Sequence, residues 1–387
     1  MTAPLIKGWC PGALRPMMSG DGLVVRIRPH AGRLSPDQAR GIADLADLHG
    51  NGLIDLSARA NLQIRGVRDA SYPALIEGLK ALGLIDPNPE AEARRNIAVS
   101  PFWQEGDGTL ALADALAAAL GHRDAPELPG KFGFAIDCGP MPLLGSTSAD
   151  IRLERAAQGA LILRADGAKN GVLVGEETAV PLAMDLARWF LDAGGAPEGR
   201  GRMAALLARG AELPQKFSDA DVITQKPALP PQPGPCAGGF LTGFEFGQIT
   251  AETVSVLAKT GAFRLTPWRM LLIEGASDLP QIEGLITAPD DVRLRVTACT
   301  GAPGCPQGLL ATRPLARALC SSLPEGAYLH VSGCAKGCAH PGPAPLVLTA
   351  CADGTFNLIR AGRAFDQPHR IGLSPESLTR NPKSLIE

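Results

Sequence analysis

The alternation of apolar and polar residues predicts a strand–helix–strand unit that occurs twice. In the first copy, a strand at residues 22–28 precedes a helix that begins at the capping sequence Ser35-Pro-Asp-Gln. That helix carries apolar residues at helical spacing, namely Ile42, Leu45, Ala46 and Leu48. The second strand of the unit, residues 55–66, aligns without a gap with residues 264–275. In the second copy, Thr250 caps a helix that carries Val254, Leu257 and Ala258.

A second pattern, two strands joined by a turn, also occurs twice. Its copies are residues 150–153 with 160–167, and residues 345–348 with 356–362. A strand-like segment precedes each copy, at residues 128–138 and 327–334. The units therefore follow the order a, b, a′, b′, which predicts an internally duplicated α+β protein with mixed sheets. We expect a pseudo-twofold axis between the halves and a ligand site in the crevice where they meet.

The composition excludes several classes of protein. The 37 Lys and Arg residues against 39 Asp and Glu residues give a formal net charge of −2, which argues against nucleic acid as a partner. The longest apolar run, residues 110–120, contains Asp114 and is too short to span a membrane. The N-terminal residues lack the pattern of a secretory signal, so a cytoplasmic location is expected. Nine cysteines in a reducing compartment indicate metal binding or catalysis where they cluster.

Four cysteines form two close pairs. Five residues separate Cys299 from Cys305, three separate Cys334 from Cys338, and 28 residues lie between the pairs. Neighbouring glycines allow these loops to wrap around an inorganic core, so the pattern predicts a 4Fe–4S cluster. A structural zinc site, which favours shorter spacing within a pair, and buried metal-free cysteines are the alternatives. The cysteines outside this pattern are Cys10, Cys138, Cys236, Cys320 and Cys351.

Two predicted strands place polar residues on one face. The period of two groups Arg26 with Arg28 in the first strand, and Asn61 with Gln63 and Arg65 in the second. Such a cationic face suits an anionic ligand, because arginine binds carboxylates through paired hydrogen bonds. A solvated sheet face with surface arginines is the alternative.

The cysteine spacing, the two strand–helix–strand copies and the order of units resemble the siroheme-dependent sulfite and nitrite reductase superfamily over nearly the whole chain. The resemblance implies a duplicated fold of two ferredoxin-like half-domains and two mixed-sheet domains. Prolines in residues 224–236 favour an extended linker between the halves. The implied segments are a first half-domain (1–85), a first reductase-like domain (86–223), the linker (224–236), a second half-domain (237–290) and a second reductase-like domain with the paired cysteines (291–387).

Residues 8–23 and 331–341 resemble one branch of this superfamily, the precorrin-3B synthases. This resemblance implies a monooxygenase of aerobic cobalamin biosynthesis, which uses O2 to hydroxylate precorrin-3A and form a lactone. An electron-donating reductase is expected as a partner, because the glycines at 234–239 follow a linker and make no nicotinamide fingerprint. The alternatives are a siroheme-dependent sulfite or nitrite reductase, and a non-catalytic iron–sulfur electron-transfer or tetrapyrrole-carrier protein.

Three anion-binding motifs of the reductases match this sequence, at Arg59, Arg95 and Lys131. Gly133 stands where the reductases have a second lysine, which suits a change from a small oxyanion to a macrocyclic substrate. Residue pattern and resemblance together give the predicted substrate-binding set: Arg26, Arg28, Arg59, Asn61, Gln63, Arg65, Arg95 and Lys131.

The resemblance also implies that Cys338 faces the tetrapyrrole, and that a mononuclear non-heme iron accompanies the cluster. His122 and Asp124 have the His-x-Asp spacing of such an iron site, although solvation of a helix end explains them better. Further candidate ligands are His30, His49, His330 and His340. No catalytic residue is assigned from the sequence.

Overall fold

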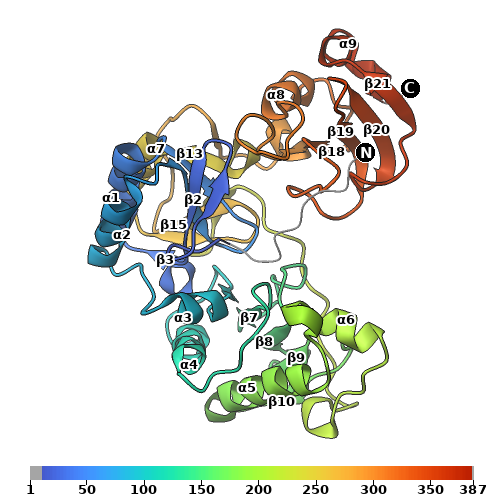
Figure 1. Ribbon diagram of the computed structural model, residues 1–387. Coiled ribbons are helices and arrows are strands. Elements are labelled where there is room, and N and C mark those ends of the chain that lie inside the picture. Colours follow the sequence, from blue (N-terminus) through green and yellow to red (C-terminus); the bar gives the residue numbers. More distant parts are fainter. Residues whose placement is uncertain (1–10, 386–387) are drawn as a thin grey trace.

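The computed structural model describes residues 11–385, so the N-terminal part of the 8–23 motif, including Cys10, lies outside the described residues. Four sheets organise this part of the chain, two antiparallel and two mixed (Figure 1). The α+β prediction is confirmed. None of the helices within residues 11–385 has the length and apolar character needed to cross a membrane.

The two antiparallel sheets lie mainly in the segments predicted as the two half-domains. The first sheet has the order β1 (Met17–Ser19), β2 (Gly22–Ile27), β5 (Leu62–Val67), β4 (Leu53–Leu56) and β13 (Gln248–Thr250). The second has the order β11 (Gly234–Cys236), β12 (Gly239–Phe244), β15 (Met270–Glu274), β14 (Phe263–Leu265) and β3 (Arg33–Leu34), with β16 (Leu285–Ile286) also beside β12. Helices α1 (Pro36–His49) and α2 (Tyr72–Ala81) belong to the first half-domain, and α7 (Ala251–Leu257) belongs to the second.

The half-domains exchange one strand each. β3 from the first copy pairs with β14, and β13 from the second copy pairs with β4. A single hydrophobic core therefore serves both copies, and α1 lies beside α7 (Figure 1). This reciprocal pairing is what an approximate twofold relation between the copies produces. The exchange crosses the predicted boundaries, because residues 33–34 and 248–250 each complete the sheet of the other half.

The two mixed sheets have the same topology. One has the order β10 (Val172–Leu173), β9 (Leu161–Ala165), β8 (Ile151–Arg155), β7 (Phe134–Asp137) and β6 (Ile97–Val99). The other has the order β21 (Arg370–Leu373), β20 (Phe356–Gly362), β19 (Ala344–Ala350), β18 (Leu329–Ser332) and β17 (Val296–Ala298). In both sheets, the first three strands along the chain pair in parallel. Each of the last two strands pairs antiparallel with the strand before it. Helices α3 (Pro89–Arg94), α4 (Thr109–Gly121), α5 (Glu176–Asp192) and α6 (Met203–Ala208) accompany the first, and α8 (Arg313–Cys320) and α9 (Pro375–Arg380) accompany the second.

Local sequence explains where the shared helices begin. Ser35 and Gln38 form the predicted capping box of α1, and the Thr250 side chain accepts a hydrogen bond from the Thr253 amide at the start of α7. The predicted apolar face of α1 is correct at Ile42 and Ala46. It is wrong at Leu48, which is 69% exposed because it lies off the stripe that faces the core.

The predicted linker is irregular over residues 225–232 and ends in β11, an edge strand of the second half-domain. Proline fits there because an edge strand leaves some backbone amides unpaired.

Candidate functional site

The four paired cysteines lie on two adjacent loops of the second mixed sheet. Cys299 follows β17, and Cys334 follows β18 by two residues. These strands are parallel neighbours, with Ala298 opposite Val331, so the loops that leave them begin at the same sheet edge.

The backbone around these cysteines fits an iron–sulfur cluster. The Gly333 amide donates a hydrogen bond to Cys299 Sγ at 2.9 Å, a contact typical of cluster ligands. A Cβ atom on Gly333 would lie only 3.1 Å from Gly301 Cα, so a larger residue would push the two loops apart. The residues present are therefore suited to a 4Fe–4S cluster held by Cys299, Cys305, Cys334 and Cys338.

The electrostatics of the four thiols are coupled. Burial raises the pKa of Cys334 and of Cys338, and the nearby Cys299 and Cys305 raise both values further. Four neighbouring thiolates become favourable only beside cationic centres such as iron ions.

No three His, Cys, Asp or Glu side chains within residues 11–385 form a group that could hold a single metal ion. The ligands of one zinc ion would have to converge on one point. A cubane cluster instead presents separate iron corners, each bound by its own thiolate.

The candidate ligands of a mononuclear iron are dispersed. His122 Nδ1 lies 3.6 Å from Asp124 Oδ2 on an exposed turn after α4, and the exposed His30 lies beside Asp114. His49 is the last residue of α1. The described residues do not bring three such side chains together at any of these positions.

His330 and His340 lie nearer the cysteine loops, with ring centroids 5.8 Å apart. His330 is fully buried, its ring nitrogens have no hydrogen-bond partner among the described residues, and burial lowers its pKa to about 4.

A cavity of about 320 Å³ adjoins Cys299 and Cys338, and we call it the basic cavity. Four arginines and one aspartate provide its charged groups, so it favours an anionic ligand. Its principal lining residues are Arg26, Asp55, Arg59, Gln63, Arg269, Cys299, Arg313 and Cys338.

Strand register creates one wall of this cavity. Arg26 lies opposite Gln63, and Gln63 lies opposite Asp55 on the other side. The Arg26 guanidinium donates to Gln63 Oε1 at 2.8 Å. Gln248, from the exchanged strand β13, donates to Asp55 Oδ1 at 2.8 Å. The strand exchange between halves therefore helps to orient the wall.

Arg59 reaches the cavity from the turn after β4. Its guanidinium donates to the Lys131 carbonyl at 3.1 Å and to Ser148 Oγ at 3.3 Å. Arg59 and Asn61 also line a smaller adjoining cavity. A Cβ atom on Gly133 would lie 3.8 Å from Arg59 Nη1, so the position of the missing lysine borders this arginine.

Two other residues of the predicted set lie away from the basic cavity. Arg95 Nε is 2.7 Å from Asp86 Oδ1. The Lys131 side chain is exposed and lines a separate cavity with Arg202.

Arg28 and Arg65 are buried beside carboxylates. Arg28 lies 3.4 Å from Glu92, and burial is the main reason that its pKa is lowered to about 10. Arg65 binds Asp21 at 2.7 Å and donates to the carbonyl of Gly304, which precedes Cys305. Arg65 therefore connects the first half-domain to a cysteine loop.

Arg269 and Arg313 line the basic cavity but were not predicted. Arg313 lies 3.6 Å from Asp55, and Arg269 donates to the Ala339 carbonyl at 3.1 Å. The repeat alignment could have indicated Arg269, because it pairs this residue with Ala60, the neighbour of Arg59. Both residues of the pair have positive φ, 60° and 52°. Arg313 stands outside the repeated strands and gave no comparable signal.

Comparison with known proteins identifies the fold of this chain. Residues 15–82 match the family described as "Nitrite/Sulfite reductase ferredoxin-like half domain". The structure resembles that of the Mycobacterium tuberculosis NirA protein with a TM-score of 0.63 and 16% sequence identity, covering 94% of this chain and 80% of that one. The chain therefore has the nitrite/sulfite reductase fold, as its sequence predicted.

Three known proteins are similar in sequence to this chain. The chain is 29% identical to precorrin-3B synthase from Sinorhizobium sp over 416 residues, covering 95% of this chain and 85% of that protein. It is 26% identical to ferredoxin–nitrite reductase from Synechococcus elongatus, covering 84% of this chain and 76% of that enzyme. The chloroplastic ferredoxin–nitrite reductase of Oryza sativa is 22% identical, with 92% and 72% covered. The chain is thus a homologue of oxidoreductases, including precorrin-3B synthase.

Proposed function

We propose that this protein is a precorrin-3B synthase, which hydroxylates precorrin-3A with O2 and closes a lactone on the product. The observation that carries the proposal is the basic cavity beside the paired cysteines in a chain similar to a precorrin-3B synthase over 95% of its length. Precorrins carry several carboxylate arms, which suit the arginines of this cavity. The glycine at position 133 leaves Arg59 without the neighbouring lysine of the reductases.

The protein's own residues have defined tasks in this proposal. Arg26 and Arg59 bind carboxylates at the first half-domain, while Arg313, beside Asp55, binds them from the second reductase-like domain. A 4Fe–4S cluster held by the paired cysteines would supply single electrons when bound. Fixing the substrate against the cavity wall reduces the entropy lost when it meets O2. One oxygen atom enters the substrate, and the other leaves as water with two electrons and two protons from an external donor.

The remaining members of the predicted set, Arg28, Asn61, Gln63, Arg65, Arg95 and Lys131, stay predictions as substrate-binding residues. Their contacts favour indirect roles for Arg28, Arg65 and Arg95, because each guanidinium lies against a carboxylate and none of the three lines the basic cavity. Gln63 orients Arg26 within the cavity wall.

The test is turnover by anaerobically purified, cluster-replete protein supplied with precorrin-3A, O2, NADH and a flavin reductase. We expect a hydroxylated lactone that contains one atom from ¹⁸O2, and no rapid turnover when the reductase is omitted. Absence of product with every component present would refute the proposal.

A siroheme-dependent nitrite or sulfite reductase is the second candidate, favoured by the similarity to two ferredoxin–nitrite reductases. Tightly bound siroheme with reduction of nitrite or sulfite would establish it in place of the first.

A further inference from the structure

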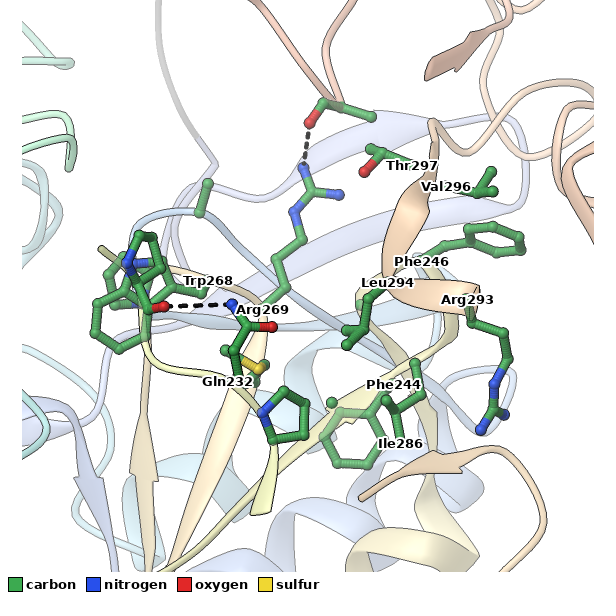
Figure 2. Close-up of a pocket in the computed structure, with 18 of the residues that line it drawn as sticks. Gln232, Phe244, Phe246, Trp268, Arg269, Ile286, Arg293, Leu294, Val296 and Thr297 are labelled. Carbon is green, nitrogen blue, oxygen red and sulfur yellow. Dashed lines mark hydrogen bonds between the residues drawn. The ribbon is translucent and has the colours of Figure 1, made fainter. Parts of the chain in front are cut away.

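A second, larger cavity adjoins the basic cavity. It has a volume of about 530 Å³ and shares Ala58, Arg269 and Ala339 with the basic cavity. We call it the aromatic cavity, after Phe246, Trp268 and Tyr328 in its lining. Figure 2 shows the first two of these side chains. The two cavities therefore meet at Arg269: four arginines line the first, and several aromatic side chains line the second.

The internal repeat shows how the second copy differs at this point. Trp268 occupies the position of Arg59, and Met270 that of Asn61. Tyr328 precedes β18 as Gly133 precedes β7, and the parallel registers of the two mixed sheets coincide there. One copy thus provides charged and polar groups for a ligand, while the other provides an aromatic wall.

Arg269 joins these two environments. It has a φ of 60°, in the left-handed region that residues other than glycine rarely adopt. Its guanidinium donates to the carbonyl of Ala339, the residue after Cys338. In Figure 2, Arg269 extends between Trp268 on one side and Thr297 and Phe246 on the other. A ligand that filled both cavities would have to pass this guanidinium.

The aromatic side chains in the lining of this cavity suit a flat ring system. Trp268 Nε1 is itself buried, so we expect the ligand to meet the indole ring rather than this N–H group. The linker segment 230–233 closes another side of the cavity. Aromatic faces stack favourably on planar conjugated ligands.

We propose that one polycarboxylate tetrapyrrole spans both cavities, with Arg269 binding an acidic arm and Trp268 contacting the ring. The inference rests on the substrate class of the proposed function and adds Arg269 and Trp268 to its binding residues. It needs no turnover, so binding tests it separately from the oxygen chemistry.

The probe is uroporphyrin III, an octacarboxylate macrocycle, titrated into cluster-replete protein. Arg269→Met is expected to weaken its affinity about tenfold, the effect of losing one charge-assisted hydrogen bond, and Arg269→Lys to restore part of it. Trp268→Leu should weaken affinity more than Trp268→Phe, which retains a stacking surface. Bound porphyrin should quench tryptophan fluorescence less in Trp268→Phe than in the unsubstituted protein.

Arg33→Met is the control, because Arg33 lies outside both cavities and its guanidinium is bound to Glu274 at 2.7 Å. The affinity of this variant for uroporphyrin III is expected to change less than twofold. If uroporphyrin did not bind, or if Arg59→Ala weakened binding while the Arg269 and Trp268 variants did not, the extended site would be refuted. Tight binding without precorrin-3A turnover would support this inference and count against the proposed activity alone.

Discussion

Replacing Arg65 by Met tests whether this arginine holds the cysteine loop in place. Its guanidinium binds Asp21 at 2.7 Å, lies 3.6 Å from Asp55, and donates to the Gly304 carbonyl at 3.0 Å. The Ser19 hydroxyl and the Gly20 amide also donate to that carbonyl. Methionine retains much of the apolar length of arginine but removes the charge and every donor.

The expected loss follows from burial. The side chains of Arg65, Asp21 and Asp55 are 7%, 22% and 11% exposed. Removing one partner of a buried ion pair costs 3 to 5 kcal/mol, and Asp55 retains Arg313 nearby, so we expect a loss of about 3 kcal/mol in the free energy of unfolding.

Urea denaturation followed by circular dichroism, with the cluster intact under anaerobic conditions, measures this loss. Arg33→Met is the matched control, because its pair with Glu274 involves a 40% exposed arginine and Glu274 retains Arg264. That control should lose less than about 1 kcal/mol. If Arg65→Met lost less than about 1 kcal/mol of stability and bound uroporphyrin more weakly, Arg65 would be a ligand-binding residue. It would then not be the residue that holds the cysteine loop in place.

Further substitutions separate structure from ligand binding. Serine at Cys299, Cys305, Cys334 or Cys338 should lower the iron and sulfide content, whereas Cys320→Ser, in α8, should leave both unchanged; full metal content in the four variants would rule out the cluster assignment. Arg95→Ala should destabilise the protein by about 3 kcal/mol without altering uroporphyrin affinity, because its partner Asp86 is also largely buried; a selective loss of affinity would assign Arg95 to the ligand. His330 has a folded-state pKa of about 4, below the ordinary 6.5, so the unfolded chain binds its proton first and stability falls as pH decreases from 6.5 to 4. His330→Phe should remove up to about 3 kcal/mol of this pH dependence, measured as the difference between the two urea-denaturation series; parallel pH profiles would contradict it. Ser35→Ala should cost about 1 kcal/mol through loss of the α1 capping box, and an unchanged urea midpoint would refute that role.

Local patterns in the sequence determined much of the fold. Period-two and helical spacing depend on neighbouring residues alone, so they located the repeated strands and both capped helices. Alignment of the repeats predicted the duplication, and the matching strand orders of the paired sheets confirm it. Cysteine spacing led to the cluster hypothesis because loop length limits which thiolates can surround one core.

Only the tertiary structure decided which cations meet. Strand alternation groups Arg26 with Arg28, yet Arg26 borders the basic cavity while Arg28 lies buried beside Glu92. Arg269 and Arg313 reach the same cavity from segments more than 200 residues beyond Arg59, a juxtaposition set by packing of the two halves. The exchange of β3 and β13 was likewise invisible, because a strand's sequence shows which face is apolar but not which sheet will provide its hydrogen bonds.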